Sequence, residues 1–160
     1  MTTTEHNTVI AGDQETATAG DYGTAFSGEC GTATAGEYGT AGAGDHGTAT
    51  AGYGGTATAG DHGTAIADDY GTATAGYGGT ATAGRGGAAR AGTRGTATAG
   101  RDGTATAGEG GIVIAGVRGT LVLRHWDVSR WHLVTAYVGE DGILPDTPYR
   151  LDEDGRFIQA

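Results

Sequence analysis

Residues 31–38 read Gly-Thr-Ala-Thr-Ala-Gly-Glu-Tyr, and this eight-residue unit decides how the chain folds. Close copies of it follow one another between Thr8 and Thr120, with threonine returning every eight residues. Only Ala88 and Ile112 interrupt this threonine column. A fixed short period predicts one structural unit stacked on itself, so equivalent residues are best compared in columns.

The Thr-Ala-Thr-Ala run within each unit alternates with period two, which is typical of a β-strand. Threonine is β-branched and suits an exposed strand position, while glycine on either side allows a sharp turn. Successive side chains of a strand point to opposite faces, so both threonines of a Thr-x-Thr triplet share one face. We expect alanine inside and threonine outside, around a thin core made largely of methyl groups.

The pairs of residues between successive units show that the structural period is sixteen. Alternate units carry Asp21-Tyr22, Glu37-Tyr38 and Asp69-Tyr70, and the units between them carry Glu29-Cys30, Asp45-His46 and Asp61-His62. One coil therefore holds two strands and two turns, and two different edges run along the stack. We predict an all-β fold, a β-solenoid of about seven 16-residue coils over residues 8–124, preceded by a tail at 1–7.

Residues 125–160 differ in composition from the repeats and predict a small C-terminal cap. Bulky aliphatic side chains are nearly absent before Ile112 and then cluster at 112–114, at 121–123 and at Trp126, where the last coil should meet the cap. Strand-like segments follow at 134–138, 149–151 and 156–158, with a turn at 139–142. At the other end, Val9 and Ile10 form only a modest apolar plug.

The composition excludes an ordinary globular domain, because glycine accounts for 34 of 160 residues and the apolar content is mostly alanine. Glycine-rich acidic sequence is often disordered, but the strict register of threonine and glycine favours a folded repeat. The net charge is −10, and residues 1–80 hold ten acids and no lysine or arginine. Residues 81–124 hold six arginines against Asp102 and Glu109. This polarity favours association of molecules through unlike charges, although solubility alone would also explain the acids.

Several other classes of function lack support. The single cysteine, Cys30, cannot form an internal disulfide, the N-terminus lacks the pattern of a signal peptide, and no apolar run is long enough to span a membrane. Serine occurs only at 27 and 129, and the glycine-rich stretches recur as turns, so we expect neither an enzyme nor a cofactor. Cys30, His46 and His62 should stack along one edge, but ligands on an exposed ladder do not enclose an ion, so we predict no metal site.

The pattern Ala-Gly-Tyr-Gly-x-Thr-x-Thr at 51–58 and 75–82 resembles the repeat of bacterial ice nucleation proteins. The segments 124–127, 139–143, 146–149 and 153–154 resemble the C-terminal cap of that family, and arginine replaces threonine in the last coils, as at Arg90. The resemblance covers roughly residues 8–158. It implies a β-solenoid with outward Thr-x-Thr rows that order water, arginine-bearing coils at 85–124 that support multimers, and ice nucleation at the bacterial cell surface or outer membrane. Family members carry far more coils and an N-terminal domain associated with the outer membrane, so the resemblance leads us to expect a short form without that domain.

Two outward threonine faces follow from the sixteen-residue coil. Face one should hold the candidate ice- and water-binding residues Thr16, Thr18, Thr32, Thr34, Thr48, Thr50, Thr80, Thr82, Thr96 and Thr98, with Ile66 as its main flaw. Face two is less regular, because Phe26, Gly42 and Arg90 occupy threonine positions. Threonine is also simply a good exposed strand residue, so the rows alone do not establish a ligand.

Candidate association residues are the late arginines and the stacked tyrosines, namely Arg85, Arg90, Arg94, Arg101, Arg118, Tyr22, Tyr38 and Tyr70. The expected partners are ice or ordered water and further copies of the chain, with no nucleic acid and no membrane span. Two alternatives stay open. The acidic half could imitate the charge of DNA for a protein partner, or the rod could be a filament former with inert threonine faces.

Overall fold

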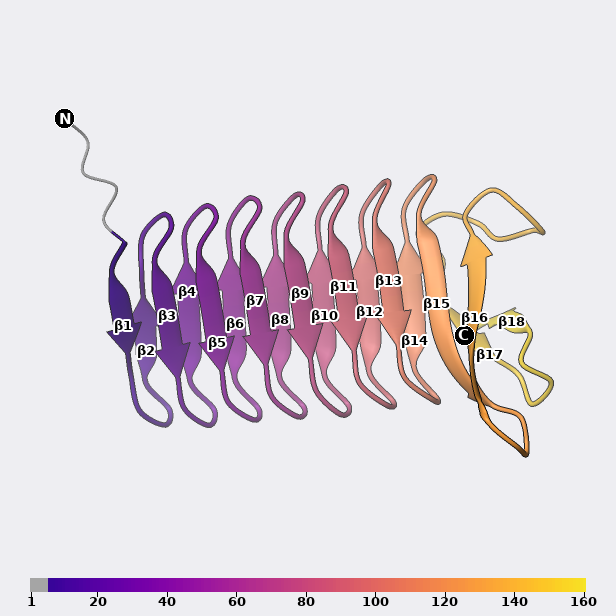
Figure 1. The fold of residues 1–160 in the computed structure, drawn as a ribbon, viewed down its shortest axis with the longest axis horizontal. Helices are drawn as coiled ribbons and strands as arrows, with labels where there is room; N and C mark the ends of the chain where they lie inside the picture. Colours follow the sequence, from indigo (N-terminus) through magenta and orange to yellow (C-terminus); the bar gives the residue numbers. More distant parts are fainter. Residues whose placement is uncertain (1–5) are drawn as a thin grey trace.

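The computed structural model describes residues 6–160, which form strands and turns without a helix. The chain winds as a rod in which, from β1 to β15, odd-numbered strands lie in one sheet and even-numbered strands in the other (Figure 1). Sheet A holds, in spatial order, β1 (Thr8–Ile10), β3 (Thr24–Ser27), β5 (Thr40–Ala43), β7 (Thr56–Ala59), β9 (Thr72–Ala75), β11 (Ala88–Ala91), β13 (Thr104–Ala107), β15 (Thr120–Trp126) and β16 (Trp131–Tyr137). Sheet B holds β2 (Thr16–Thr18), β4 (Thr32–Ala35), β6 (Thr48–Ala51), β8 (Thr64–Ala67), β10 (Thr80–Ala83), β12 (Thr96–Ala99), β14 (Ile112–Ala115), β17 (Tyr149–Leu151) and β18 (Phe157–Gln159).

Within the repeat, neighbouring strands of each sheet are parallel and shifted by sixteen residues. Thr32 pairs with Thr48 and Ala33 with Ala49, and the same register returns on every rung. The predicted β-solenoid with two strands per coil is therefore confirmed. Because the register never changes, each side chain stands beside its equivalent in the next coil, and columns in the sequence become straight rows on the surface.

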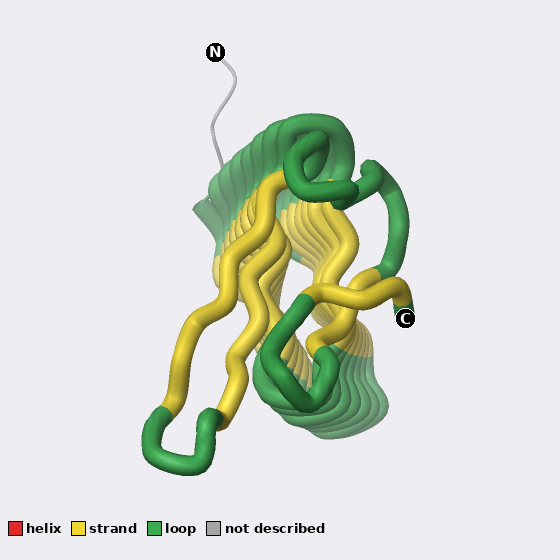
Figure 2. The backbone as a smooth tube through the Cα atoms, turned by 90° about the vertical axis from the view of Figure 1, so that its right-hand side faces the viewer, coloured by secondary structure: helices red, strands yellow, loops and turns green. Residues whose placement is uncertain are grey.

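The core is a narrow layer of alanine between the two sheets, whose stacked strands are viewed along the rod in Figure 2. The central alanine of each Thr-Ala-Thr triplet is fully buried, as at Ala33 and Ala49, and the alanine that ends most strands is nearly so, as at Ala35 and Ala51. The threonines around them remain partly or fully exposed. The predicted arrangement of alanine inside and threonine outside is confirmed. Such a core buries few methylene groups, so the backbone ladders carry much of the order.

Every strand of the repeat ends in a tight turn whose second central residue has a positive φ. In one such turn the Gly20 carbonyl accepts a hydrogen bond from Gly23 N–H at 3.0 Å, and Tyr22 has φ 56°. His46, His62 and Arg94 occupy the same left-handed conformation in other coils. That conformation is costly for any residue except glycine, at about 1–2 kcal/mol. The side chains at these corners are thus held out from the rod at a cost in backbone strain.

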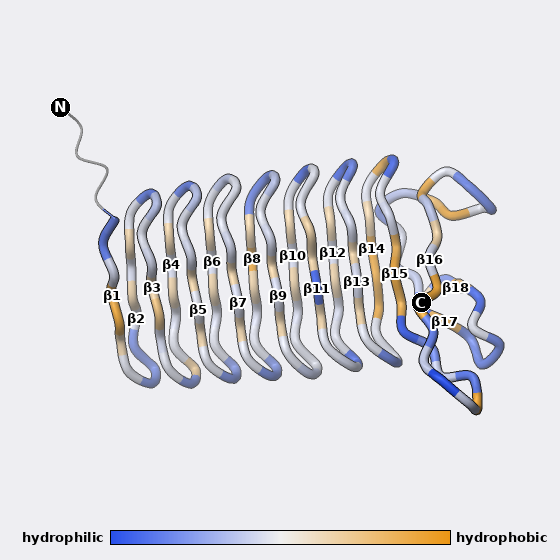
Figure 3. The backbone as a smooth tube through the Cα atoms, in the orientation of Figure 1, coloured by the Kyte–Doolittle hydropathy of each residue, from blue (hydrophilic) through white to orange (hydrophobic). Residues whose placement is uncertain are grey.

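The cap closes both sheets with antiparallel strands. β16 pairs antiparallel with β15 in sheet A, and β17 joins β14 through Val113 and Tyr149 before pairing with β18. The core widens here, and Val113, Leu121 and Leu123 are its largest fully buried side chains. The change from pale alanine strands to strongly hydrophobic ones is visible at β14 and β15 in Figure 3.

Three details of the expected ends are wrong. Trp126 does not belong to the buried apolar cluster, because 45% of it is exposed. β15 continues across the expected boundary at 124, and its partner β16 begins at Trp131 rather than at 134, since the two strands pair along their full length. At the N-terminal end Val9 packs partly against the core, but Ile10 is 76% exposed and plugs nothing.

Candidate water-binding faces and association edges

Face one is the outer surface of sheet B from β2 to β12, and it carries two straight rows of side chains. Thr16, Thr32, Thr48, Thr64, Thr80 and Thr96 form one row, and Thr18, Thr34, Thr50, Ile66, Thr82 and Thr98 form the other. All ten threonines predicted for this surface lie on it. Eleven of its twelve positions are threonine, none is charged, and none is buried.

The geometry of face one follows from the strand ladders. Residues two apart on a strand are separated by about 6.6–6.8 Å and neighbouring rungs by about 4.8 Å, so hydroxyl and methyl groups repeat on a near-rectangular grid. Threonine has two heavy atoms on Cβ, which restricts χ1 and keeps the grid regular. The next rung, at β14, replaces both threonines by Ile112 and Ile114, so the hydroxyl rows end there.

Face two, the outer surface of sheet A, is broken at both ends. Its intact triplet threonines occur at β7, β9 and β13, and β11 separates β13 from the others by placing Arg90 between Thr74 and Thr106. Near the N-terminal end, Phe26 pairs with Gly42. Face one is therefore the longer uncharged array, as the sequence predicted.

The turns that lead from sheet B to sheet A form one edge of the rod, which we call the tyrosine edge. Tyr22 and Tyr38 stack with ring centroids 5.3 Å apart, and Tyr53 continues the ladder in edge-on contacts at 5.6 Å to both Tyr38 and Tyr70. Desolvation raises the pKa of Tyr38, and the neighbouring acidic groups of Tyr53, Tyr22 and Glu37 raise it further. The predicted stacking of Tyr22, Tyr38 and Tyr70 along one edge is therefore present, with Tyr53 bridging the last two.

The opposite turns form a second edge, which we call the histidine edge. His46 and His62 stack at 5.3 Å, Tyr77 meets His62 edge-on at 5.5 Å, and Arg94 Nη1 donates to the Tyr77 hydroxyl at 3.0 Å.

Residues 6–160 contain no group of three His, Cys, Asp or Glu side chains placed to hold a metal ion. The same residues contain no helix long and apolar enough to cross a membrane.

The structure distributes the late arginines over three sides of the rod instead of gathering them in one patch. Arg85, Arg101 and Arg118 lie on the tyrosine edge, Arg94 lies on the histidine edge, and Arg90 projects from face two. Arg118 is already paired, because its Nε and Nη2 donate to both oxygens of Asp102 at 2.7 Å. This bidentate contact lowers the pKa of Asp102. Arg85 and Arg90 have no carboxylate partner among the described residues.

A ladder of aspartates along both edges was not anticipated from the sequence. The Asp61 carboxylate accepts a hydrogen bond at 2.7 Å from Tyr77 N–H, one coil further on, and Asp61 N–H donates at 2.8 Å to Asp45. Asp21 and Asp69 accept equivalent bonds from the next turn. Recurrence of aspartate at the first turn position every sixteen residues was the signal that could have revealed it.

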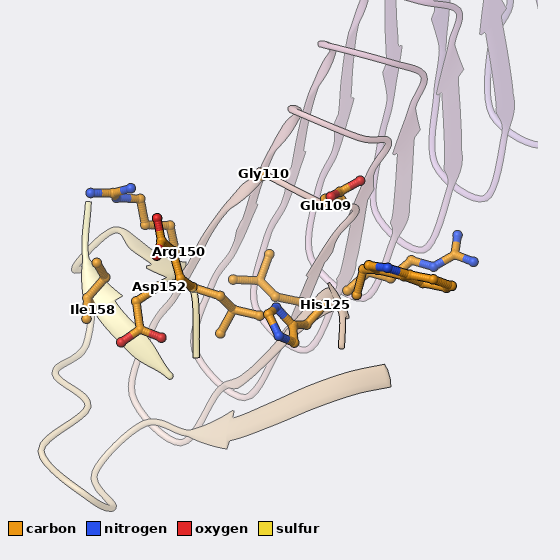
Figure 4. Close-up of a pocket in the computed structure, with 12 residues that line it drawn as sticks. Glu109, Gly110, His125, Arg150, Asp152 and Ile158 are labelled. Atoms are coloured by element: carbon orange, nitrogen blue, oxygen red, sulfur yellow. The ribbon is translucent and has the colours of Figure 1, made fainter. Parts of the chain in front are cut away.

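A half-open cleft of about 490 Å³ separates the last histidine-edge turn from the cap (Figure 4). Glu109, His125, Arg150 and Asp152 line it, so acidic and basic groups are mixed around its rim. This mixture gives the cleft no single preference for an anion or a cation.

No protein family, curated protein or solved structure matches the chain.

Proposed function

We propose that this protein orders water and binds ice through the threonine rows of face one, and that assemblies of many copies act as ice nucleators of the bacterial type. One observation carries the proposal: eleven threonines and one isoleucine stand in two in-register rows with no charge among them. A charged side chain would impose its own hydration shell on the surface water. Uncharged hydroxyls and methyls on a rigid grid instead offer water a repeating set of sites.

The size of the array explains why association matters. The rungs of one rod extend face one over about 30 Å at the spacing of a β-sheet. A surface this short orders only a small cluster of water, so one copy acts only at deep supercooling. Several copies with their faces aligned would present a larger surface and initiate freezing at higher temperature.

The tyrosine edge is charged in an order that suits pairing with a second copy. Its first turn positions read Asp21, Glu37, Tyr53, Asp69, Arg85 and Arg101 along the rod, as backbone hydrogen bonds between successive turns establish. In an antiparallel pair, Asp21 would face Arg101 of the second copy and Glu37 would face Arg85. Both contacts would occur twice by symmetry, with the tyrosine rings between them. This arrangement gives the unpaired Arg85 an acidic partner.

The deciding experiment compares two double variants in a droplet-freezing assay on purified, size-fractionated protein. Thr34→Leu with Thr50→Leu replaces two adjacent outward positions on face one, and Thr58→Leu with Thr74→Leu makes the matched change on face two. We expect the face-one variant to freeze at lower temperature and the face-two variant to stay close to the parent. Equal freezing temperatures for all three proteins would refute the proposal and favour a filament former with inert faces.

The acidic columns of the first coils also suit a rod that imitates DNA. The exposed arginines at 85, 90, 94 and 101 weigh against it, because they would repel the basic surface of a DNA-binding protein. Salt-sensitive capture of such a protein by the purified chain, together with unchanged droplet freezing, would favour the DNA-mimic function instead.

A further inference from the structure

The loop joining β15 to β16 ends in a valine that the rest of the chain leaves uncovered. Val128 is 94% exposed and has φ 61°, the left-handed conformation that is a clear outlier for a β-branched residue. Packing within the chain does not compensate for this strain. Strained, apolar and exposed positions at a loop apex suggest a role in contact with something outside the molecule.

Two tryptophans flank this apex. Trp126 and Trp131 face each other across the hairpin with ring centroids 5.2 Å apart, and 45% and 43% of their surfaces are exposed. The Arg124 guanidinium lies 4.4 Å from the centre of the Trp131 ring. Leu133, which pairs with Arg124, is 70% exposed on the same outer side. We call residues 126–131 the hairpin tip.

Asp127 is the only acidic residue of the hairpin tip, and its carboxylate is hydrogen-bonded within its own loop. One oxygen of Asp127 accepts hydrogen bonds from Ser129 N–H, the Ser129 hydroxyl and Arg130 N–H, and the other contacts His132 Nε2. Arg124 and Arg130 are exposed residues and form no ion pair among the described residues, although Arg130 Nε donates to His132 Nε2 at 3.3 Å. The hairpin tip therefore presents an apolar apex between aromatic rings, with positive charge beside it.

The position of the hairpin leaves this surface accessible. Viewed along the rod, the β15–β16 hairpin extends outside the outline of the stacked coils (Figure 2), and in Figure 1 its loop projects at the capped end. A broad, flat partner could touch the hairpin tip without meeting the solenoid.

The geometry discriminates between possible partners. A sugar-binding platform needs aromatic rings close to one plane, whereas the tryptophan planes here are inclined by 62°. A nucleic acid would stack on the rings but would gain nothing from an aliphatic apex. Tryptophan next to arginine, around an exposed apolar apex, matches the interface of a lipid bilayer.

We propose that the hairpin tip docks on an anionic bilayer surface, with Val128 entering the acyl boundary, the tryptophans at headgroup level and Arg124 and Arg130 facing lipid phosphates. The apolar contact is small, so a single copy binds weakly. An assembly that presents several hairpin tips on one side would bind more tightly through multivalency.

The chain itself supplies the probe, because its two tryptophans are both in the hairpin tip. The full chain is mixed with vesicles of phosphatidylglycerol and phosphatidylcholine, with pure phosphatidylcholine vesicles as the comparison. We expect co-flotation with the anionic vesicles, a blue shift of tryptophan emission, and quenching by lipids brominated on their acyl chains. Added salt should weaken binding, since arginine–phosphate attraction is screened.

Val128→Gly is the informative variant, because glycine accepts the left-handed conformation and leaves folding intact. Partition into anionic vesicles should fall by about tenfold, the factor expected for one valine side chain that is no longer buried. Val117→Gly is the matched control, since Val117 is 51% exposed on the solenoid edge, and it should bind like the parent. Arg124→Gln with Arg130→Gln should remove the preference for anionic lipid.

Three results would overturn the proposal. The first is absence of co-flotation with anionic vesicles. The second is co-flotation that leaves tryptophan emission unchanged, or co-flotation that Val128→Gly does not diminish. Either outcome would place the lipid contact elsewhere on the chain. The third is a blue shift that appears on concentrating the protein without vesicles, which would make the hairpin tip a contact between copies.

Discussion

The ring of Phe26 lies over Gly42, its direct neighbour on the next coil, so that a β-carbon at Gly42 would be 2.5 Å from the ring. The two residues that break face two near its start are therefore one packing unit. A large side chain occupies the space that its neighbour leaves empty. Neither residue is an independent defect in the threonine pattern, and changing one alters the fit of the other.

Stability of variants at these two positions should be strongly non-additive. Gly42→Thr alone forces the Phe26 ring out of its site, whereas Phe26→Thr with Gly42→Thr restores two ordinary rungs. We expect a favourable coupling of about 0.5–3 kcal/mol between the two substitutions, measured by a double-mutant cycle in thermal or urea unfolding. If water ordering depends on row length, the double variant should also raise the droplet-freezing temperature. Additive unfolding energies would show that the ring does not pack on Gly42.

Glycine at a left-handed corner should be required most where a ring covers it. A β-carbon at Gly54 would lie 2.7 Å from the Tyr38 ring, whereas at Gly110 the nearest contact is 3.6 Å from Arg94. Both residues have nearly the same positive φ, so Gly110→Ala measures backbone strain alone, about 1–2 kcal/mol. Gly54→Ala should cost clearly more in urea unfolding. Equal losses would mean that the tyrosine ladder moves aside freely.

The aspartate ladder predicts a difference between two acids of similar exposure. Asp61→Ala removes an acceptor for Tyr77 N–H and should lower the free energy of unfolding by about 0.5–1.5 kcal/mol. Asp61→Asn keeps an acceptor oxygen and should recover most of the loss. Glu37→Ala is the control, because the Glu37 side chain makes no such bond in the structure. A loss in Asp61→Asn as large as in Asp61→Ala would point to charge rather than hydrogen bonding.

Charge exchange tests the antiparallel arrangement of the tyrosine edge. Arg85→Glu with Arg101→Glu makes that edge acidic, and Asp21→Arg with Glu37→Arg makes it basic. We expect each protein alone to form smaller particles than the parent in light scattering, because like charges would then meet across the pair. A mixture of the two should regain the parent's particle size. Failure of the mixture to associate would exclude this register.

The hairpin tip should lose order only in strong acid. Hydrogen bonding from Ser129, together with Arg130 and His132, lowers the pKa of Asp127 to about 2. Because this pKa is depressed in the folded state, its contribution to stability is present above about pH 4 and is lost as the pH falls toward 2. Tryptophan emission should stay constant from pH 7 to about pH 4 and change below it. In Asp127→Asn the step should disappear, and a step near neutral pH in the parent would contradict the assignment.

The sequence alone determined the coil length, the inward alanines, the two threonine faces and the two stacked edges. It could do so because strand alternation has a period of two and the repeat never changes register, so each column in the sequence becomes a row in space. It also identifies face one as the more regular of the two arrays, because fewer of its threonine positions are replaced. The function that this array serves is a proposal that the freezing experiment decides.

Only the tertiary structure decided which neighbours meet across coils and where the repeat stops being regular. Phe26 contacts Gly42, and Asp61 contacts Tyr77, because the nearest rung lies sixteen residues away. The exposure of Trp126 depends on β15 running beyond the last coil to pair with β16, and local patterns do not specify that extension. The arginines likewise separate onto three sides because each occupies a different point of the coil, a property of the winding rather than of their spacing in the chain.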